Sequence, residues 1–367
     1  MKLHFIQNEA TPHNNALIRE LFETEELELV LWYAREESNK YKWMTNPTHE
    51  ILPANIYGDS HINWDLVFRL VTHRAEKVFQ TGWGNPTTRM NVFLFWLTRR
   101  SYNLWFDYPQ DQVERSLVKK WLRELFYYIL KRSKVNVFCV GKMVVEYFAE
   151  RGFPRKRLIN LPVLVDATRN KEDYAHHRNR IRSKYCVGES DLFLVAGSRL
   201  TKDKGYDLLI QALTILPTEK QKYVKTLIIG KGKEKENLLR QISEVGFSNY
   251  IFIEEWMDVD EYRACISNAD VFIHPARFDA YGGGTLNAMS LGVPVIASYQ
   301  SGSGPDRIDN GVSGWLYDSK DVATLSALIE DFYNDSSSLK DMGKKARETS
   351  QTWSSDRVVK ILRENVV

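Results

Sequence analysis

Residues 271–297 read VFIHPARFDAYGGGTLNAMSLGVPVIA and contain an apolar run, three glycines, a helical stretch and a second apolar run. The first run, Val271–His274, is short and bounded by proline, which is typical of a buried strand. Leu286–Leu291 has the pattern of a short helix, and Pro294–Ala297 that of a further strand. A strand, a helix and a strand in this order are the unit of a parallel sheet with helices on its faces.

The same alternation extends upstream of this unit. Strand patterns lie at Leu192–Gly197, Thr226–Gly230 and Ile251–Ile253, and helical patterns at Tyr206–Leu213, Lys233–Val245 and Asp260–Asn268. This predicts a doubly wound parallel sheet, which binds its ligand at the carboxyl ends of the strands.

The N-terminal half repeats the alternation less regularly. Strands are expected at Leu3–Ile6, Leu27–Trp32, Lys77–Phe79, Asn103–Phe106 and Asn136–Val140, and helices at Asn15–Phe22, Ile62–Arg74, Met90–Thr98 and Gln112–Lys134. In the last helix Val113, Leu117, Trp121 and Leu125 recur every four residues, which predicts that this face packs on the core. The fold class is therefore α/β, with two Rossmann-like sheets.

The length of 367 residues, of which 43% are hydrophobic, fits two domains. We expect an N-terminal domain over residues 1–166, with a hinge at Asn160–Asp166, and a C-terminal domain over residues 167–350. Residues 351–367 follow the second sheet, and we expect their helix to return to the first domain.

A loop rich in cations follows the strand pattern at Leu192–Gly197. Residues 197–205 read GSRLTKDKG and place Arg199 and Lys204 just before a helix. Two cations beside a helix N-terminus are suited to clamp a diphosphate. The alternative is that both are solvated loop cations.

The loop after Val271–His274 contains three consecutive glycines, which are Gly282, Gly283 and Gly284. Glycines cost conformational entropy, and they are justified where backbone N–H groups must approach a ligand. Asp279 precedes them, and Thr285 and Asn287 follow on the helix. This set suits a polyhydroxylated ligand that carries a phosphate. The alternative is a tight turn capped by Asp279.

These loops, in this order, resemble the donor-binding domain of glycosyltransferase family 4, a retaining family with the GT-B architecture. The resemblance extends from Gly197 to Asp318 and includes residues 268–275 (NADVFIHP) and 310–316 (NGVSGWL). The family has an Arg…Lys pair in its first loop and two glutamates, seven residues apart, around its second. Here Asp279 and Asn287 stand at the two glutamate positions.

The resemblance implies transfer of a sugar from a nucleotide sugar, with retention, to a glycan or lipid-linked saccharide in bacterial surface polysaccharide or lipopolysaccharide assembly. Arg199 and Lys204 would stabilise the departing diphosphate without a metal or other cofactor. Asp279 would orient the sugar and stabilise developing positive charge, and Asn287 would bind the ribose. Trp256 and Met257 lie where the family holds the nucleobase, although both also suit core packing.

The first domain is then expected to bind the acceptor. Asp107 follows a predicted strand and is a candidate catalytic side chain or, equally, a turn cap. Trp83 lies in a glycine-containing loop after another strand and suits a sugar contact. His13 follows the first strand. Asp258 and Asp260 resemble a metal-binding pair, but they open a predicted helix and are interpreted as caps.

Charge is unevenly distributed along the chain. The net charge is +3, yet residues 99–157 carry 14 basic and 6 acidic side chains. With Trp96, Trp105 and Trp121 nearby, this region predicts a peripheral contact with an anionic membrane, the alternative being a solvated helix face. No nucleic-acid-binding module accompanies it, so nucleic acid is not expected as a partner. The three widely spaced cysteines and the lack of a long apolar run indicate a cytoplasmic protein.

Two other functions fit the same residues. A nucleotide-sugar epimerase on this architecture would act on the donor with no acceptor. A catalytically silent binding or scaffold subunit would explain Asn287 in place of a glutamate. Incubation with the donor alone separates the first alternative from a transferase, and Asn287→Glu tests the second.

Overall fold

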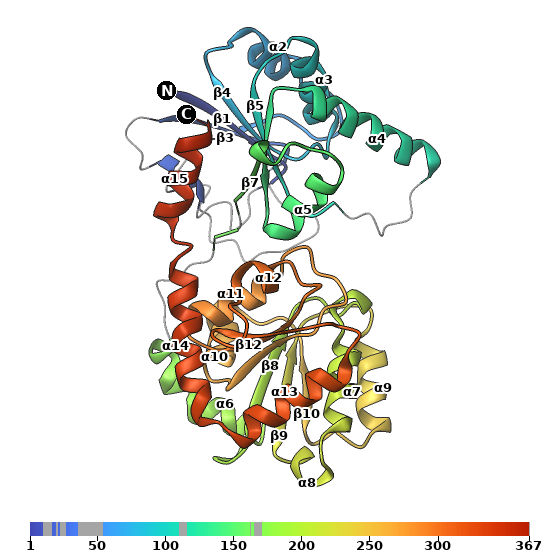
Figure 1. Ribbon diagram of the computed structural model, residues 1–367, viewed down its shortest axis with the longest axis vertical. Helices are drawn as coiled ribbons and strands as arrows, with labels where there is room; N and C mark the ends of the chain where they lie inside the picture. The colour runs from blue at the N-terminus through green and yellow to red at the C-terminus, as the bar shows by residue number, and fades with distance from the viewer. Residues whose placement is uncertain are drawn as a thin grey trace. The chain divides into compact units, whose positions relative to one another are not determined.

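The computed structural model describes residues 1–9, 17–19, 21–22, 27–35, 54–109, 116–161, 163–164 and 171–366. The chain divides into two compact units: Met1–Leu164 together with Ser355–Val367, and Val165–Ser354 (Figure 1). Each unit is built on a parallel sheet with helices, so the predicted α/β fold with two doubly wound sheets is confirmed.

The second unit has a six-stranded sheet in the order β10-β9-β8-β11-β12-β13. Its strands are β8 (Leu192–Gly197), β9 (Val224–Ile229), β10 (Ile251–Glu254), β11 (Val271–His274), β12 (Val295–Ser298) and β13 (Gly314–Tyr317). Its helices are η3 (Glu172–His177), α6 (Arg178–Lys184), η4 (Lys202–Lys204), α7 (Tyr206–Ile215), α8 (Thr218–Gln221), α9 (Lys235–Glu244), α10 (Val259–Ser267), α11 (Gly283–Ser290), α12 (Ser303–Arg307), α13 (Val322–Asn334) and α14 (Ser337–Gln351). The strand order reverses between β8 and β11, which makes their carboxyl ends the crevice where such sheets bind ligands.

The sheet of the second unit is buried on both faces, which explains why its strands could be predicted from apolar runs in the sequence. Successive residues of a strand point to opposite faces. Accordingly Phe193 and Leu194 of β8 belong to different apolar clusters, as do Phe272 and Ile273 of β11. Strands covered on both faces read as continuous apolar runs. The predicted bounds of β8 and β11 agree with the structure to the residue.

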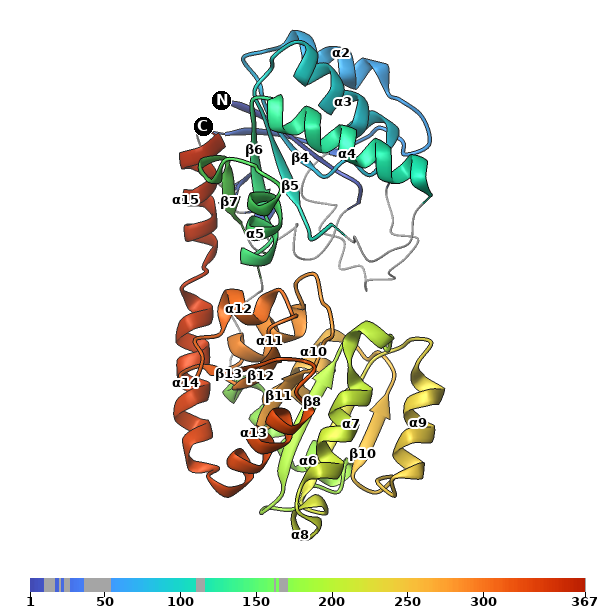
Figure 2. The same cartoon turned by 45° about the vertical axis from the view of Figure 1, so that its right-hand side comes forward.

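The first unit has a seven-stranded sheet in the order β3-β2-β1-β4-β5-β6-β7. Its strands are β1 (Lys2–Gln7), β2 (Glu28–Tyr33), β3 (Ala54–Ile56), β4 (Lys77–Thr81), β5 (Tyr102–Phe106), β6 (Val135–Cys139) and β7 (Leu158–Asn160). Its helices in the described part are α2 (Trp64–Thr72), α3 (Pro86–Leu97), α4 (Leu117–Arg132), α5 (Lys142–Glu150), η2 (Arg155–Arg157) and α15 (Ser355–Val366) (Figure 2). The sequence did not predict β3 and β7, because three residues at a sheet edge are too few for a periodic signal.

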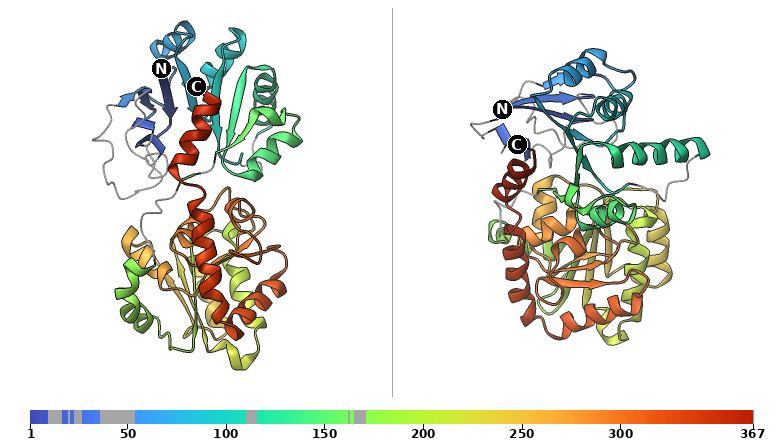
Figure 3. Two further views of the ribbon diagram at one scale, coloured as in Figure 1. Left: turned by 60° about the vertical axis from the view of Figure 1, so that its left-hand side comes forward. Right: turned by 45° about the horizontal axis from the view of Figure 1, so that its top comes forward.

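The prediction that the face of α4 around Trp121 packs on the core is wrong. Leu117 and Trp121 are 82% and 64% exposed, and Leu125 is also exposed. The buried residues of the helix lie near its C-terminal end. Figure 1 and the right-hand view in Figure 3 show the N-terminal end of α4 extending away from the sheet of its unit. Val113, predicted for the same face, lies outside the described residues.

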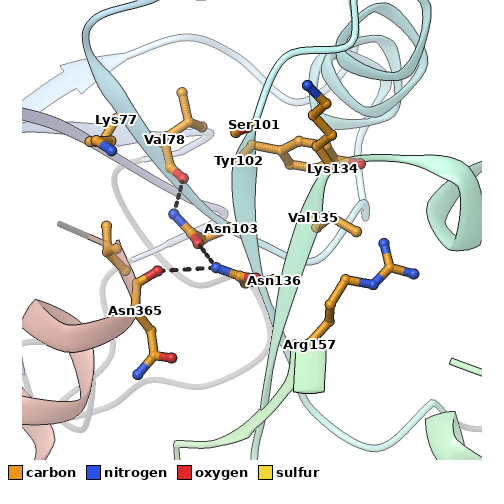
Figure 4. Close-up of a pocket in the computed structure, with 11 residues that line it drawn as sticks. Lys77, Val78, Ser101, Tyr102, Asn103, Lys134, Val135, Asn136, Arg157 and Asn365 are labelled. Atoms are coloured by element: carbon orange, nitrogen blue, oxygen red, sulfur yellow. Dashed lines mark hydrogen bonds between the residues drawn. The ribbon is translucent and has the colours of Figure 1, made fainter. Parts of the chain in front are cut away.

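The C-terminal helix α15 is fastened to the sheet of the first unit by asparagines. Asn103 and Asn136 are paired neighbours on β5 and β6. The Asn136 amide donates to the Asn103 side-chain oxygen at 3.3 Å and to the Asn365 carbonyl at 3.0 Å (Figure 4). A cavity of about 250 Å³ beside them lies at the amino ends of the strands, opposite the edge where ligands of parallel sheets bind.

We expect Asn136→Ala to lower the free energy of unfolding by about 1–3 kcal/mol, because it leaves the Asn365 carbonyl and the Asn103 amide oxygen without their donor. Denaturant unfolding measures the loss, and limited proteolysis should cut earlier around residues 351–354. Lys360→Ala is the control, since this side chain of α15 is 75% exposed and lies 3.9 Å from the Glu364 carboxylate, a long distance for an ion pair. Equal losses in the two variants would contradict a fastening role for Asn136.

Candidate active site

Two loops meet at the carboxyl edge of the second sheet. Residues 198–205 follow β8, and residues 275–282 follow the neighbouring strand β11. The Phe278 N–H donates to the Asp203 carbonyl at 3.0 Å and ties the loops together. The structure therefore brings the cation-containing loop and the glycine loop side by side at the point where the strand order reverses.

A buried polar cluster joins these loops, and it consists of Lys204, His274, Asp279 and Thr285. Lys204 Nζ lies 2.9 Å from Asp279 Oδ2, and His274 Nε2 lies 3.1 Å from the same oxygen. On the other side of the ring, His274 Nδ1 lies 2.9 Å from Thr285 Oγ1. All four residues are at least nine-tenths buried. The cluster thus links the end of β11, both loops and the first turn of α11.

The carboxylate of Asp279 fixes the proton positions in this cluster. Burial alone would raise the pKa of Asp279, but the hydrogen bond from His274 and the charge of Lys204 outweigh it and hold that pKa well below its usual value. An ionised carboxylate only accepts hydrogen bonds. His274 Nε2 therefore donates to Asp279, and His274 Nδ1 forms a second hydrogen bond with the Thr285 hydroxyl.

Two of the three glycines are required by close packing. Gly282 has φ +91° and caps α11, and a side chain there would run into the His274 ring. A Cβ on Gly284 would stand 2.7 Å from the Phe272 ring and 3.1 Å from the Gly197 carbonyl oxygen. Helix α11 consequently begins at Gly283, whereas the sequence predicted a start at Leu286. The glycines bring the helix N-terminus against β8 and β11 rather than forming a loose turn.

The two predicted cations occupy different environments. Lys204 is buried and also contacts Asp203 at 3.3 Å. Arg199 is exposed, and within the described residues no side-chain hydrogen bond or ion pair engages it. By contrast Lys202, in the same loop, pairs with Asp207 at 2.7 Å. Arg199 is therefore the cation of this loop that is exposed and has no counter-charge among the side chains that the structure describes.

The other residues predicted to bind the donor lie around the two loops. Asn287 lies on α11 and donates to the Gly283 carbonyl at 3.1 Å. Trp256 is 51% exposed, which excludes core packing for it, whereas Met257 packs against the core. Asp258 caps α10 by accepting from the Glu261 N–H at 2.8 Å, as expected of a helix cap.

The first unit has its own reversal of strand order, between β1 and β4. Trp83 follows β4, but its ring packs among Phe106, Phe126 and Tyr127 at centroid distances of 4.7–5.6 Å. Asp107 follows β5, is exposed and accepts from the Tyr108 N–H at 2.8 Å. His13 lies outside the described residues.

His274 is the residue of this site to which the sequence assigned no role. It ends a buried apolar strand, and a polar side chain at the carboxyl end of a parallel strand is the feature of the sequence that could have marked it as a site residue.

Among the described residues, no group of three His, Cys, Asp or Glu side chains is placed to hold a metal ion. No helix in that part of the chain is long and apolar enough to cross a membrane.

Comparison with known proteins matches part of the chain to relatives. Residues 177–349 match the family model "Glycosyl transferases group 1". A GDP-mannose-dependent alpha-(1-6)-phosphatidylinositol monomannoside mannosyltransferase of Mycolicibacterium smegmatis is 32% identical over 205 residues, which are 53% of this chain and 52% of the relative. The capsular polysaccharide biosynthesis glycosyltransferase CapM of Staphylococcus aureus is 27% identical over 51% of this chain and 49% of its own. The chain thus spans about half the length of these relatives.

Solved structures resemble the chain over nearly its whole length. Anabaena HepE in complex with UDP superposes with a TM-score of 0.76 at 16% identity and covers 99% of both chains. WaaG, a glycosyltransferase involved in lipopolysaccharide biosynthesis, gives 0.67 at 15% identity and covers 100% of this chain and 99% of its own. The chain has the GT-B fold, and its residues 177–349 carry the sequence pattern of the group 1 glycosyl transferases.

Proposed function

We propose that this protein transfers a sugar from a nucleotide-diphosphate sugar to a glycan or lipid-linked saccharide in bacterial surface polysaccharide synthesis. The observation that carries the proposal is the meeting of the Arg199 loop and the glycine loop at the strand reversal of the second sheet. The family match over residues 177–349 supports it, because the match includes both loops.

The donor diphosphate would bind between these loops. Arg199 would contact it directly, because this guanidinium has no competing carboxylate among the described residues. The N–H groups of Gly283 and Gly284 at the start of α11 would supply further donors. Lys204 would exchange its contact with Asp203, which is 39% exposed, for a phosphate oxygen and keep its contact with Asp279. We propose that these groups stabilise the departing diphosphate without a metal ion.

Asp279 would face the sugar as an anion. Glycosyl transfer passes through an oxocarbenium-like state, and a nearby carboxylate stabilises its positive charge. His274 and Lys204 hold this carboxylate in one orientation. Asn287 would contact the ribose, and Trp256 and Met257 the base. Retention of the anomeric configuration is proposed from the resemblance to the retaining family.

The acceptor would bind to the first unit near its own strand reversal. Asp107 and Trp83 follow β5 and β4 at the carboxyl edge of that sheet, where the ligand of a parallel sheet is expected. Because its ring is largely engaged by other aromatic residues, Trp83 would offer an edge rather than a face to a sugar. His13 is proposed for the same acceptor site.

A thermal-shift screen of nucleoside diphosphates and nucleotide sugars tests the donor assignment. The named relatives point to two bases, GDP for the mycobacterial mannosyltransferase and UDP for HepE. The true donor at about 100 times its dissociation constant should stabilise the fold by about 2.7 kcal/mol. Nucleoside monophosphates are the control, because they lack the diphosphate that Arg199 would bind. No stabilisation by any diphosphate or nucleotide sugar would contradict the proposal.

A further inference from the structure

Helix α4 presents an apolar stripe to solvent. Leu117, Trp121, Leu125 and Tyr128 follow one another at spacings of four, four and three residues, which places them on one face of a helix. Val118 and Leu122 lie beside them. All six are exposed, between 38% and 82%. Monomeric proteins seldom leave so many large apolar side chains together in water, and such patches mark interaction sites.

The orientation of this stripe is set by the opposite face of the helix. Tyr127 and Leu130 are buried, and the Tyr127 hydroxyl lies 2.8 Å from that of Tyr147 on α5. A surface helix normally turns its apolar face toward the core. In α4 the C-terminal half is packed, so the helix cannot rotate, and the apolar stripe of its N-terminal half is held outward.

Cations border the stripe. The helix carries Lys119, Lys120, Arg123, Lys131 and Arg132 against one acid, Glu124. The Arg132 guanidinium stacks over the Tyr128 ring at 3.7 Å, at the edge of the stripe. Helix α3 contacts both α2 and α4. Helices α2 and α3 expose four more large apolar side chains. These are Trp64, Phe68, Phe93 and Leu97.

We propose that α4 lies in the interface of an anionic lipid bilayer, with its apolar stripe among the acyl chains and its cations at the lipid phosphates. Amphipathic helices that bind in this way have large aromatic and aliphatic side chains bordered by Lys and Arg. Charge selects this occupant over a second copy of the chain, because a second α4 would bring five more cations into the contact. The proposal does not depend on sugar transfer, since the surface lies on the first unit and needs no donor.

Vesicle sedimentation with the full chain tests the proposal. We expect binding to phosphatidylcholine vesicles that contain phosphatidylglycerol, little binding to phosphatidylcholine alone, and weaker binding at high salt. Lys119→Gln with Lys120→Gln should weaken binding about 25-fold, because each cation near an anionic surface contributes about five-fold. Trp121→Glu with Leu125→Glu should weaken it at least about ten-fold, because both side chains leave the acyl region.

Ile215→Glu is the matched control, since this side chain on α7 is 55% exposed and lies in the other unit. It should leave vesicle binding unchanged. Nucleotide-induced thermal stabilisation, measured on every variant, separates this proposal from the donor assignment, because the two readouts fail independently. The proposal is overturned if wild type does not bind anionic vesicles, or if the Trp121/Leu125 variant binds them as well as wild type. A dimer without lipid that the same variant dissociates would also overturn it, by assigning the stripe to self-association.

Discussion

Lys204→Met is expected to destabilise the second unit by about 3–5 kcal/mol, the usual loss when one member of a buried ion pair is removed. Methionine keeps most of the buried stem, but in the described part of the chain it leaves the Asp279 carboxylate with His274 as its hydrogen-bonding side chain. Urea unfolding measured by circular dichroism reports the change in unfolding free energy.

Lys202→Met is the matched control in the same loop. Lys202 is 63% exposed and pairs with Asp207 at the surface, so its loss should cost less than about 1 kcal/mol. The double variant Lys204→Met/Asp279→Asn should regain part of the stability, because no unpaired charge then remains buried. A Lys204→Met variant as stable as Lys202→Met would show that the ion pair contributes nothing.

The contribution of the Lys204–Asp279 ion pair to folding stability depends on pH. The pKa of Asp279 is lower in the folded state than the unfolded value of about 3.9. Its contribution is therefore fully present above about pH 4–5 and is lost as the pH falls further. The difference in stability between wild type and Lys204→Met should be constant near neutral pH and should shrink below about pH 4.

Arg199→Ala is expected to reduce turnover of the proposed transferase by about 10²–10³-fold, the cost of removing one group that stabilises developing charge on a leaving group. Because Arg199 is exposed, its loss should change stability by less than about 0.5 kcal/mol. Steady-state kinetics with the donor found by thermal shift should show a lower kcat together with weaker diphosphate binding.

Lys202→Ala again provides the comparison, since it removes one positive charge from the same loop at a position already neutralised by Asp207. Turnover of Lys202→Ala should stay within a few-fold of wild type. Equal losses in the two variants would mean that the net charge of the loop matters and that Arg199 has no specific contact. Undiminished turnover in Arg199→Ala would remove the diphosphate clamp from the mechanism.

The contrast between β11 and α4 shows how far the sequence alone could be interpreted. Strand β11 was predicted to the residue because burial on both faces makes its side chains apolar up to Ile273, and Pro275 follows His274. The periodicity of α4 correctly placed Leu117, Trp121 and Leu125 on one face. Periodicity does not say whether that face meets the core or solvent, because the direction depends on where the helix is anchored.

The site was predictable in its loops but not in its contacts. The order of strands and helices placed the Arg199 loop and the glycine loop at one sheet edge. The pairing of Lys204 with Asp279, which are 75 positions apart in the chain, depends on side-chain packing that no local pattern encodes. For the same reason the glycines were interpreted as backbone donors to a ligand or as a tight turn, and the sequence did not show that Gly284 is needed to let α11 approach Phe272.

The assignment of α15 to the first unit makes that unit discontinuous, since residues 165–354 are inserted before its last helix. At a synthesis rate of about 5–20 residues per second, α15 is made on the order of ten seconds or more after the sheet of the first unit. Over that interval the Asn136 amide, which later donates to Asn365, lacks this acceptor. The emerging chain is therefore expected to complete its second unit first, and a nascent polypeptide stalled before Ser355 should expose a first unit that chaperones recognise as unfinished.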